Sequence, residues 1–98
     1  MGRIGMDRYP ELVAALRDRL AAAGEEGWAD ELLAAERGAS TSTEAIQKIS
    51  VVLRRLRKEG VASRVGIRRE TKQLERAGQR ALKRAASGWG ARNQAKSG

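Results

Sequence analysis

Apolar side chains recur at helical spacing through the first sixty residues, and no stretch alternates as a half-buried β-strand would. The first stretch carries a single apolar stripe, at Leu12, Val13, Leu16, Leu20 and Ala23. Pro10 suits the first turn of a helix, and Gly24 suits the left-handed residue that often ends one. The pattern therefore predicts a helix over 10–23.

A second helix is predicted over 25–37, with Trp28 and Leu32 among its apolar positions and Gly38 after its last turn. Its acidic residues lie mainly in the early turns, where a helix N-terminus attracts negative charge, at Glu25, Glu26, Asp30 and Glu31. We interpret them as a solvated face. A metal or acid–base site is not favoured, because no third ligand type is spaced to complete one.

The clearest local signal is Thr41 followed three residues later by Glu44, which has the form of a capping box and predicts a helix start. The helix that follows, over 42–59, has the most regular apolar stripe, at Ile46, Ile49, Leu53 and Leu56. We therefore expect this helix to organise the core and to end at Gly60.

The segment 61–87 is more polar, and its two interior glycines, Gly66 and Gly78, each cost about 1 kcal/mol relative to Ala in a helix. It predicts a basic amphipathic helix with a shallow apolar strip whose small side chains would permit close backbone approach. Because this strip offers little apolar area, we expect the helix to pack loosely and to gain helix content when a partner binds. Residues 1–9 predict a flexible N-terminus, and residues 88–98, which lack periodicity, predict a disordered tail.

Together these elements predict an all-α fold, a small three- to four-helix bundle with a basic C-terminal helix and a disordered tail. Residues 10–60 are expected to form a three-helix core whose charge changes from acidic to basic along the chain. The side chains expected in this core are Leu12, Leu16, Leu20, Trp28, Leu32, Ile46, Ile49, Leu53 and Leu56.

Composition then removes several classes of function. The 98 residues include no Cys and no His, which excludes disulfides, thiolate chemistry, the usual zinc ligand sets and histidine acid–base catalysis. We therefore expect no enzyme, no cofactor and no metal site. No run approaches the roughly 18 apolar residues of a membrane span, and no secretion signal is evident, so we expect a cytoplasmic protein without a membrane partner.

Charge is distributed unevenly along the chain. Residues 7–44 hold four Arg and nine acidic residues, a net charge of −5, whereas residues 48–84 hold thirteen Lys or Arg and three Glu, a net charge of +10. Such a separation creates a directional field that can steer an oppositely charged partner.

The fourth segment concentrates this charge on one side. At 100° per residue, five cations fall within roughly 80° of one another on the side opposite the apolar strip. We call these five side chains the cationic ridge: Arg69, Lys72, Arg76, Arg80 and Lys83. Like charges one helical turn apart disfavour a helix by a few tenths of a kcal/mol per pair, so the pattern favours a function that uses an anionic partner.

Two functions fit this pattern best. The first is a small non-catalytic protein that binds nucleic acid through the cationic helix face, and the alternative is a protein–protein regulator, such as an inhibitor, antitoxin-like factor or adaptor, that docks on an acidic protein. A membrane-surface helix fits less well because its apolar face would need larger side chains. The candidate contact residues are Arg54, Arg55, Lys58, Arg68, Arg69, Lys72, Arg76, Arg80, Lys83 and Arg84.

Two further alternatives stay open. The acidic second helix and the basic fourth helix could join two copies of the chain into a homodimer. The stretch 40–61, which ends Val-Val-Leu-Arg-Arg-Leu-Arg-Lys-Glu-Gly-Val, resembles the recognition helix and exit of a winged helix-turn-helix domain, over about a quarter of the chain. That resemblance implies DNA binding and a two-stranded wing, whereas the sequence from Arg64 onward has helical spacing.

Overall fold

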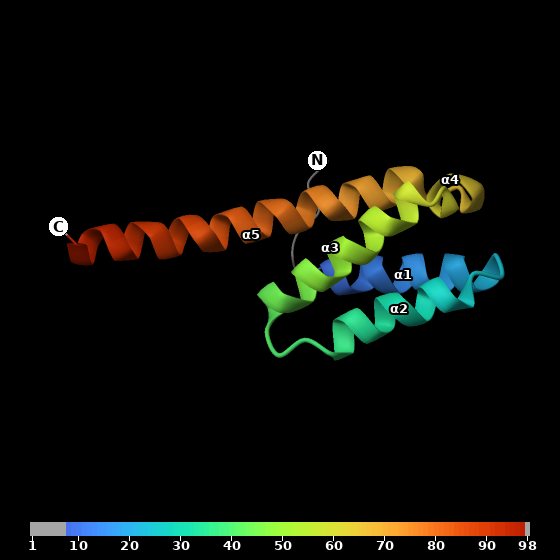
Figure 1. The fold of residues 1–98 in the computed structure, drawn as a ribbon, viewed down its shortest axis with the longest axis horizontal. Helices are drawn as coiled ribbons and strands as arrows, with labels where there is room; N and C mark the ends of the chain where they lie inside the picture. Colours follow the sequence, from blue (N-terminus) through green and yellow to red (C-terminus); the bar gives the residue numbers. More distant parts are fainter. Residues whose placement is uncertain (1–7, 98) are drawn as a thin grey trace.

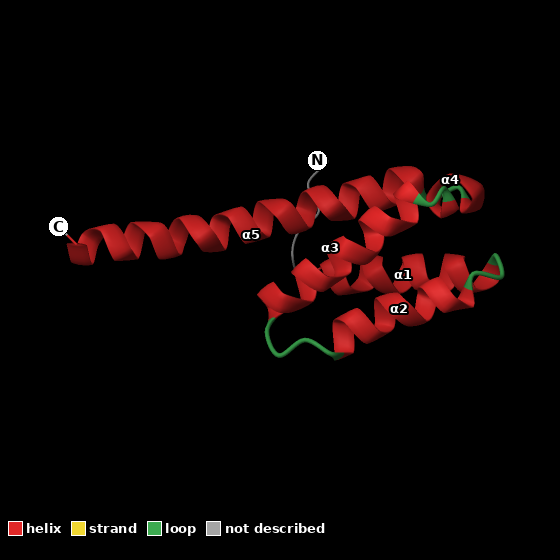
Figure 2. Cartoon of the chain, viewed as in Figure 1, coloured by secondary structure: helices red, strands yellow, loops and turns green. Residues whose placement is uncertain are grey.

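The computed structural model describes residues 8–97, with side chains described for residues 8–85. The chain forms helices in the order α1 (Tyr9–Ala22), α2 (Glu26–Arg37), α3 (Ser42–Lys58), α4 (Val61–Val65) and α5 (Arg68–Ser97) (Figure 1). Figure 2 shows loops joining these helices, and residues 8–97 contain no strand. The all-α prediction is therefore confirmed, and the two-stranded wing of a winged helix-turn-helix domain is not found within 8–97.

One core lies between the long helices. α1 packs against α2 and α5, α3 packs against α2 and α5, and the short α4 contacts α3 and α5. Most of the expected core is confirmed, since Leu16, Leu20, Leu32, Ile46, Ile49, Leu53 and Leu56 are buried. Leu12 and Trp28 are only half-buried against this core, and Ala23 is exposed.

The expected turns form at the predicted glycines. Gly24 has a φ of 81°, and the backbone N–H of Glu25 donates to the carbonyl of Leu20 at 2.8 Å while Gly24 N–H donates to Ala21 at 3.1 Å. This pair of bonds is a Schellman motif, which ends α1 and satisfies carbonyls that would otherwise lack partners. Gly60, with a φ of 77°, follows α3 in the same left-handed conformation.

The predicted capping box forms in one direction only. Thr41 is the N-cap of α3, and its Oγ1 accepts a hydrogen bond from the backbone N–H of Glu44 at 3.1 Å. The Glu44 carboxylate instead pairs with Lys48 Nζ at 3.0 Å, one helical turn along α3. The helix start was thus predicted correctly, while the partner of Glu44 was not.

The predicted single helix over 61–87 is wrong, because Gly66 divides it. Gly66 has a φ of 81°, and Ile67 N–H donates to the carbonyl of Ala62 at 2.9 Å, which ends α4 and turns the chain into α5. Ile67 is completely buried in this turn. A glycine that we interpreted as a cost within a helix is a left-handed C-cap between two helices.

The expectation of loose packing is also wrong for the first half of α5. Thr71, Leu74 and Ala77 are at most 3% exposed and lie against the core. Gly78 is buried as well, and a Cβ added to it would lie 2.9 Å from Ile46 Cγ2. Small residues at these positions let the α5 backbone approach α3 closely, so little apolar area is needed for a tight contact.

Both expected loose ends also differ from the observed fold. Tyr9, assigned to the flexible residues 1–9, begins α1 and is only 4% exposed, while residues 1–7 lie outside the described residues. Where a disordered tail was expected over 88–98, α5 continues to Ser97. Once a helix is nucleated, each further residue adds at low cost, so weak periodicity alone did not end the helix.

Candidate functional site

The cationic ridge lies on the side of α5 that faces away from the core. Arg69, Arg76, Arg80 and Lys83 are exposed and Lys72 is half-buried, whereas Ile67 and Leu74, on the opposite side of the helix, are at most 2% exposed. The buried side fixes the rotation of α5 about its axis. The ridge therefore faces away from the core in a fixed orientation.

No ridge cation forms an ion pair with any of residues 8–85. The two acids of α5 face the neighbouring helices instead. Glu70 pairs with Arg19 of α1 at 2.5 Å, and Glu75 accepts two hydrogen bonds from Arg57 of α3, at 2.5 and 2.8 Å. These two carboxylates therefore tie α5 to α1 and α3 and leave the ridge uncompensated.

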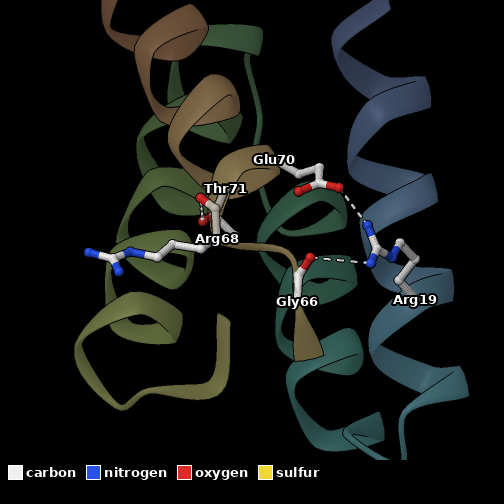
Figure 3. A network of polar contacts seen from close by, with 5 residues as sticks. All are labelled: Arg19, Gly66, Arg68, Glu70 and Thr71. Carbon is white, nitrogen blue, oxygen red and sulfur yellow. Dashed lines mark hydrogen bonds and ion pairs between the residues drawn. The ribbon is translucent and has the colours of Figure 1, made fainter. Parts of the chain in front are cut away.

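Figure 3 shows the first of these contacts, at the start of α5. The Arg19 guanidinium reaches both the Glu70 carboxylate and the backbone carbonyl of Gly66, to which it donates at 3.3 Å. Arg68, two residues before Glu70, points to the other side of the helix (Figure 3). Arg19 thus anchors the α4–α5 turn, and the Arg68 side chain is left on the side of α3.

Two acids at the start of α2 and in its early turns could have neutralised the ridge, but each pairs with another arginine. Glu25 accepts from Arg64 of α4 at 2.5 Å, and Glu31 accepts from Arg55 of α3 at 2.7 Å. The Arg55 guanidinium also lies 5.0 Å from the centre of the Trp28 ring, in a cation–π contact. Contacts within the molecule therefore hold Arg55, a candidate contact residue, on the side of α2.

Arg57 and Glu75 form the most enclosed ion pair of the described residues, with side chains 34% and 12% exposed. The hydrogen bonds to Glu75 raise the pKa of Arg57 above its already high ordinary value, so Arg57 stays protonated. It lies in the seam between α3 and α5. Lys72, Arg76 and Gln79 line the same hollow of about 230 Å³.

A second hollow opens where α3, α4 and α5 meet, and we call it the junction cleft. Its volume is about 300 Å³, and it is lined by Arg57, Lys58, Ser63 and Arg68. A third, more open hollow of about 570 Å³ lies over the first turns of α5, lined by Arg68, Arg69, Lys72, Gln73 and Arg76. Shared residues connect all three hollows, so a single cationic surface runs from the end of α3 along α5.

The structure thus brings half of the ten candidate residues together in the connected hollows. Lys58, Arg68 and three members of the ridge line the connected hollows, Arg54, Arg80, Lys83 and Arg84 are exposed, and Arg55 is separate. Sequence reasoning missed Arg57, Ser63, Gln73 and Gln79. The two glutamines could have been found by winding the helix, but Ser63 could not, because α4 was not predicted.

Comparisons with known protein families, with curated proteins and with solved structures find no match to this chain. Within the part of the chain that the structure describes, no helix has the length and apolar content to cross a membrane. The same residues contain no cluster of three or more side chains able to hold a metal ion. Function is therefore inferred from the residues of this chain alone.

Proposed function

We propose that this protein binds nucleic acid, without catalysis, through the cationic ridge and the adjoining junction cleft. The proposal rests on which cations the acidic side chains pair with. Glu25, Glu31, Glu70 and Glu75 each pair with an arginine outside the ridge, and no ridge cation has an acidic partner among residues 8–85.

The energetics of the ridge support an anionic partner. Lys72 and Arg76, and likewise Arg76 and Arg80, lie one turn apart, and each such like-charge pair disfavours the helix by a few tenths of a kcal/mol. Phosphates placed along the ridge would convert these repulsions into attractions and would release counterions from the nucleic acid. Arginine adds planar donors that match the oxygens of a phosphate.

The test is the salt dependence of binding, measured by fluorescence anisotropy with a labelled duplex. Five phosphate contacts predict a slope of about −4.5 for log affinity against log salt, which is a loss of about 500-fold between 50 and 200 mM salt. The double variant Arg80→Ala, Lys83→Ala should reduce this slope to about −2.7, because two phosphate contacts are removed.

A matched control removes the same charge elsewhere. Arg8 and Arg37 are exposed, lie at the start of α1 and the end of α2, and form no ion pair with residues 8–85, so Arg8→Ala with Arg37→Ala should leave the slope close to that of the unchanged protein. Equal effects of the two double variants would show a dependence on net charge alone and contradict the proposal. Absence of binding to any nucleic acid at 50 mM salt would also refute it and favour an acidic protein partner.

A further inference from the structure

The length and position of α5 limit the kind of nucleic acid that can lie against it. The ridge from Arg69 to Lys83 extends about 21 Å along the helix, which corresponds to about six base pairs of B-form DNA. Figure 1 shows α5 continuing beyond α1, α2, α3 and α4 towards the C-terminus, so none of these four helices lies beside that end of α5. A long groove can therefore receive the helix without a clash with α1, α2 or α3 at that end.

The diameter of an α-helix fits the major groove of B-form DNA but not the major groove of A-form RNA. An α-helix with its side chains is about 10–12 Å across, and the major groove of B-form DNA is about 12 Å wide. The major groove of A-form RNA is deep and too narrow for side chains to read. The ridge side of α5 is free of contacts with the core, so it can enter a B-form groove while the opposite side stays packed on α3 and α1.

The side chains beside the ridge are those that read base edges. Gln73 and Gln79 are exposed and flank Arg76, and each lines a hollow together with it. In a major groove, arginine pairs with the O6 and N7 atoms of guanine, and glutamine pairs with the N6 and N7 atoms of adenine. Phosphate binding alone gives no reason for neutral amides at these positions.

Residues 68–85 of α5 carry no stacking site for single-stranded nucleic acid, and Trp89 of the same helix lies outside the described side chains. Proteins that hold single strands combine cationic grooves with aromatic side chains on which bases stack. Of the aromatic residues within 8–85, Tyr9 is buried and Trp28 lies beside Arg55 on the side of α2. Neither contributes to the surface that residues 68–85 of α5 form.

The junction cleft lies beside the first turn of α5, at the edge that a groove wall would meet. Lys58 and Arg68 are exposed there, form no ion pair with residues 8–85, and share the cleft with the hydroxyl-bearing Ser63. Two cations and a hydroxyl are suited to one backbone phosphate. The cleft would thus hold the strand that borders the groove.

We propose that the nucleic acid is B-form duplex DNA, with α5 in the major groove, Arg76 at a guanine edge and a backbone phosphate in the junction cleft. This inference rests on the proposed nucleic-acid binding. It adds the class of nucleic acid and the helix that enters the groove. It also differs from a helix-turn-helix arrangement, in which α3 would be the recognition helix.

The first experiment compares duplex DNA, duplex RNA and single-stranded DNA of one guanine-containing sequence, with the full chain at fixed salt. Duplex DNA should bind at least about tenfold more tightly than either competitor. Methylation of guanine N7, which blocks the major-groove acceptor, should weaken binding by a similar factor. Equal binding to all three nucleic acids, or binding unaffected by N7 methylation, would overturn the inference while the proposed function survived.

Two variants separate base contacts from phosphate contacts. Arg76→Lys keeps the charge but removes the bidentate geometry, so the salt slope should stay unchanged while affinity falls about tenfold and sensitivity to N7 methylation is lost. Lys58→Ala with Arg68→Ala should instead reduce the slope by about 0.9, because the cleft holds one phosphate, and keep the sensitivity to methylation. Unchanged affinity of Arg76→Lys, or an unchanged slope of the second variant, would contradict the assigned roles. Absence of binding to all three nucleic acids would refute the proposed function itself.

Discussion

Gly78→Ala is the substitution that most directly tests the close approach of α5 to α3. An Ala Cβ at this position would lie 2.9 Å from Ile46 Cγ2, 3.4 Å from Ser50 Oγ and 3.5 Å from Tyr9 OH. Carbon atoms in contact normally lie about 3.5–4.0 Å apart, so the two helices would have to separate by several tenths of an ångström. The β-branched Ile46 side chain is 5% exposed and stiff at χ1, so it cannot simply rotate away.

Two opposing effects set the expected magnitude. Replacing Gly by Ala within a helix gains about 1 kcal/mol of intrinsic propensity, whereas overpacking a tight core costs about 1–3 kcal/mol. We expect the packing term to be larger, with a net loss of about 1 kcal/mol and a decrease in Tm of about 4–8 °C. Urea and thermal unfolding followed by circular dichroism at 222 nm would measure both quantities.

Gly27→Ala provides the matched control, because Gly27 lies in the first turn of α2 and nothing lies within 4 Å of the position that the added methyl group would occupy. It should stabilise the protein by about 0.5 kcal/mol. Ile46→Leu removes the γ2 methyl group that the new Cβ would meet, so the double variant should recover at least about 0.5 kcal/mol relative to the sum of the single variants. If Gly78→Ala stabilised the protein as Gly27→Ala does, or if no coupling with Ile46→Leu were found, the close contact would be refuted.

Three further substitutions test other parts of the structure. Thr41→Ala should destabilise the protein by about 1 kcal/mol in urea unfolding, because the Glu44 N–H loses its N-cap acceptor; an unchanged midpoint would contradict that role. Burial, followed by the charges of Glu36 and Glu75, raises the pKa of Tyr9 to about 12, so absorbance titration of this single tyrosine should show ionisation near pH 12. Since the folded pKa lies above the ordinary value of about 10, stability should fall as the pH rises from 10 towards 12, and Tyr9→Phe should weaken that fall. Glu75→Gln should release Arg57 beside Lys72 and Arg76, which should steepen the salt slope of nucleic-acid binding by about 1; a shallower slope would show that Arg57 is not part of the binding surface.

The sequence by itself determined the helices whose ends are marked by a proline, a glycine or an N-capping residue. Pro10 and Gly24 bounded α1, Thr41 marked the start of α3, and the 3.6-residue period placed Ile46, Ile49, Leu53 and Leu56 in the core. The same period grouped the five ridge cations on one side of α5, because side-chain direction along a helix depends only on residue spacing. These features are local, so they can be predicted without knowledge of the fold.

Only the tertiary structure decided which charges have partners. Each of the ion pairs of Glu25, Glu31, Glu70 and Glu75 joins residues from different elements or their caps, so no spacing along the chain could assign them. The role of Gly78 also depended on the fold, because a glycine that weakens an isolated helix is required where a second helix crosses within van der Waals distance. Contacts between residues far apart in the sequence are set by packing. The ridge could therefore be predicted from residue spacing alone. That no acid among residues 8–85 pairs with it became evident only from the arrangement of the helices.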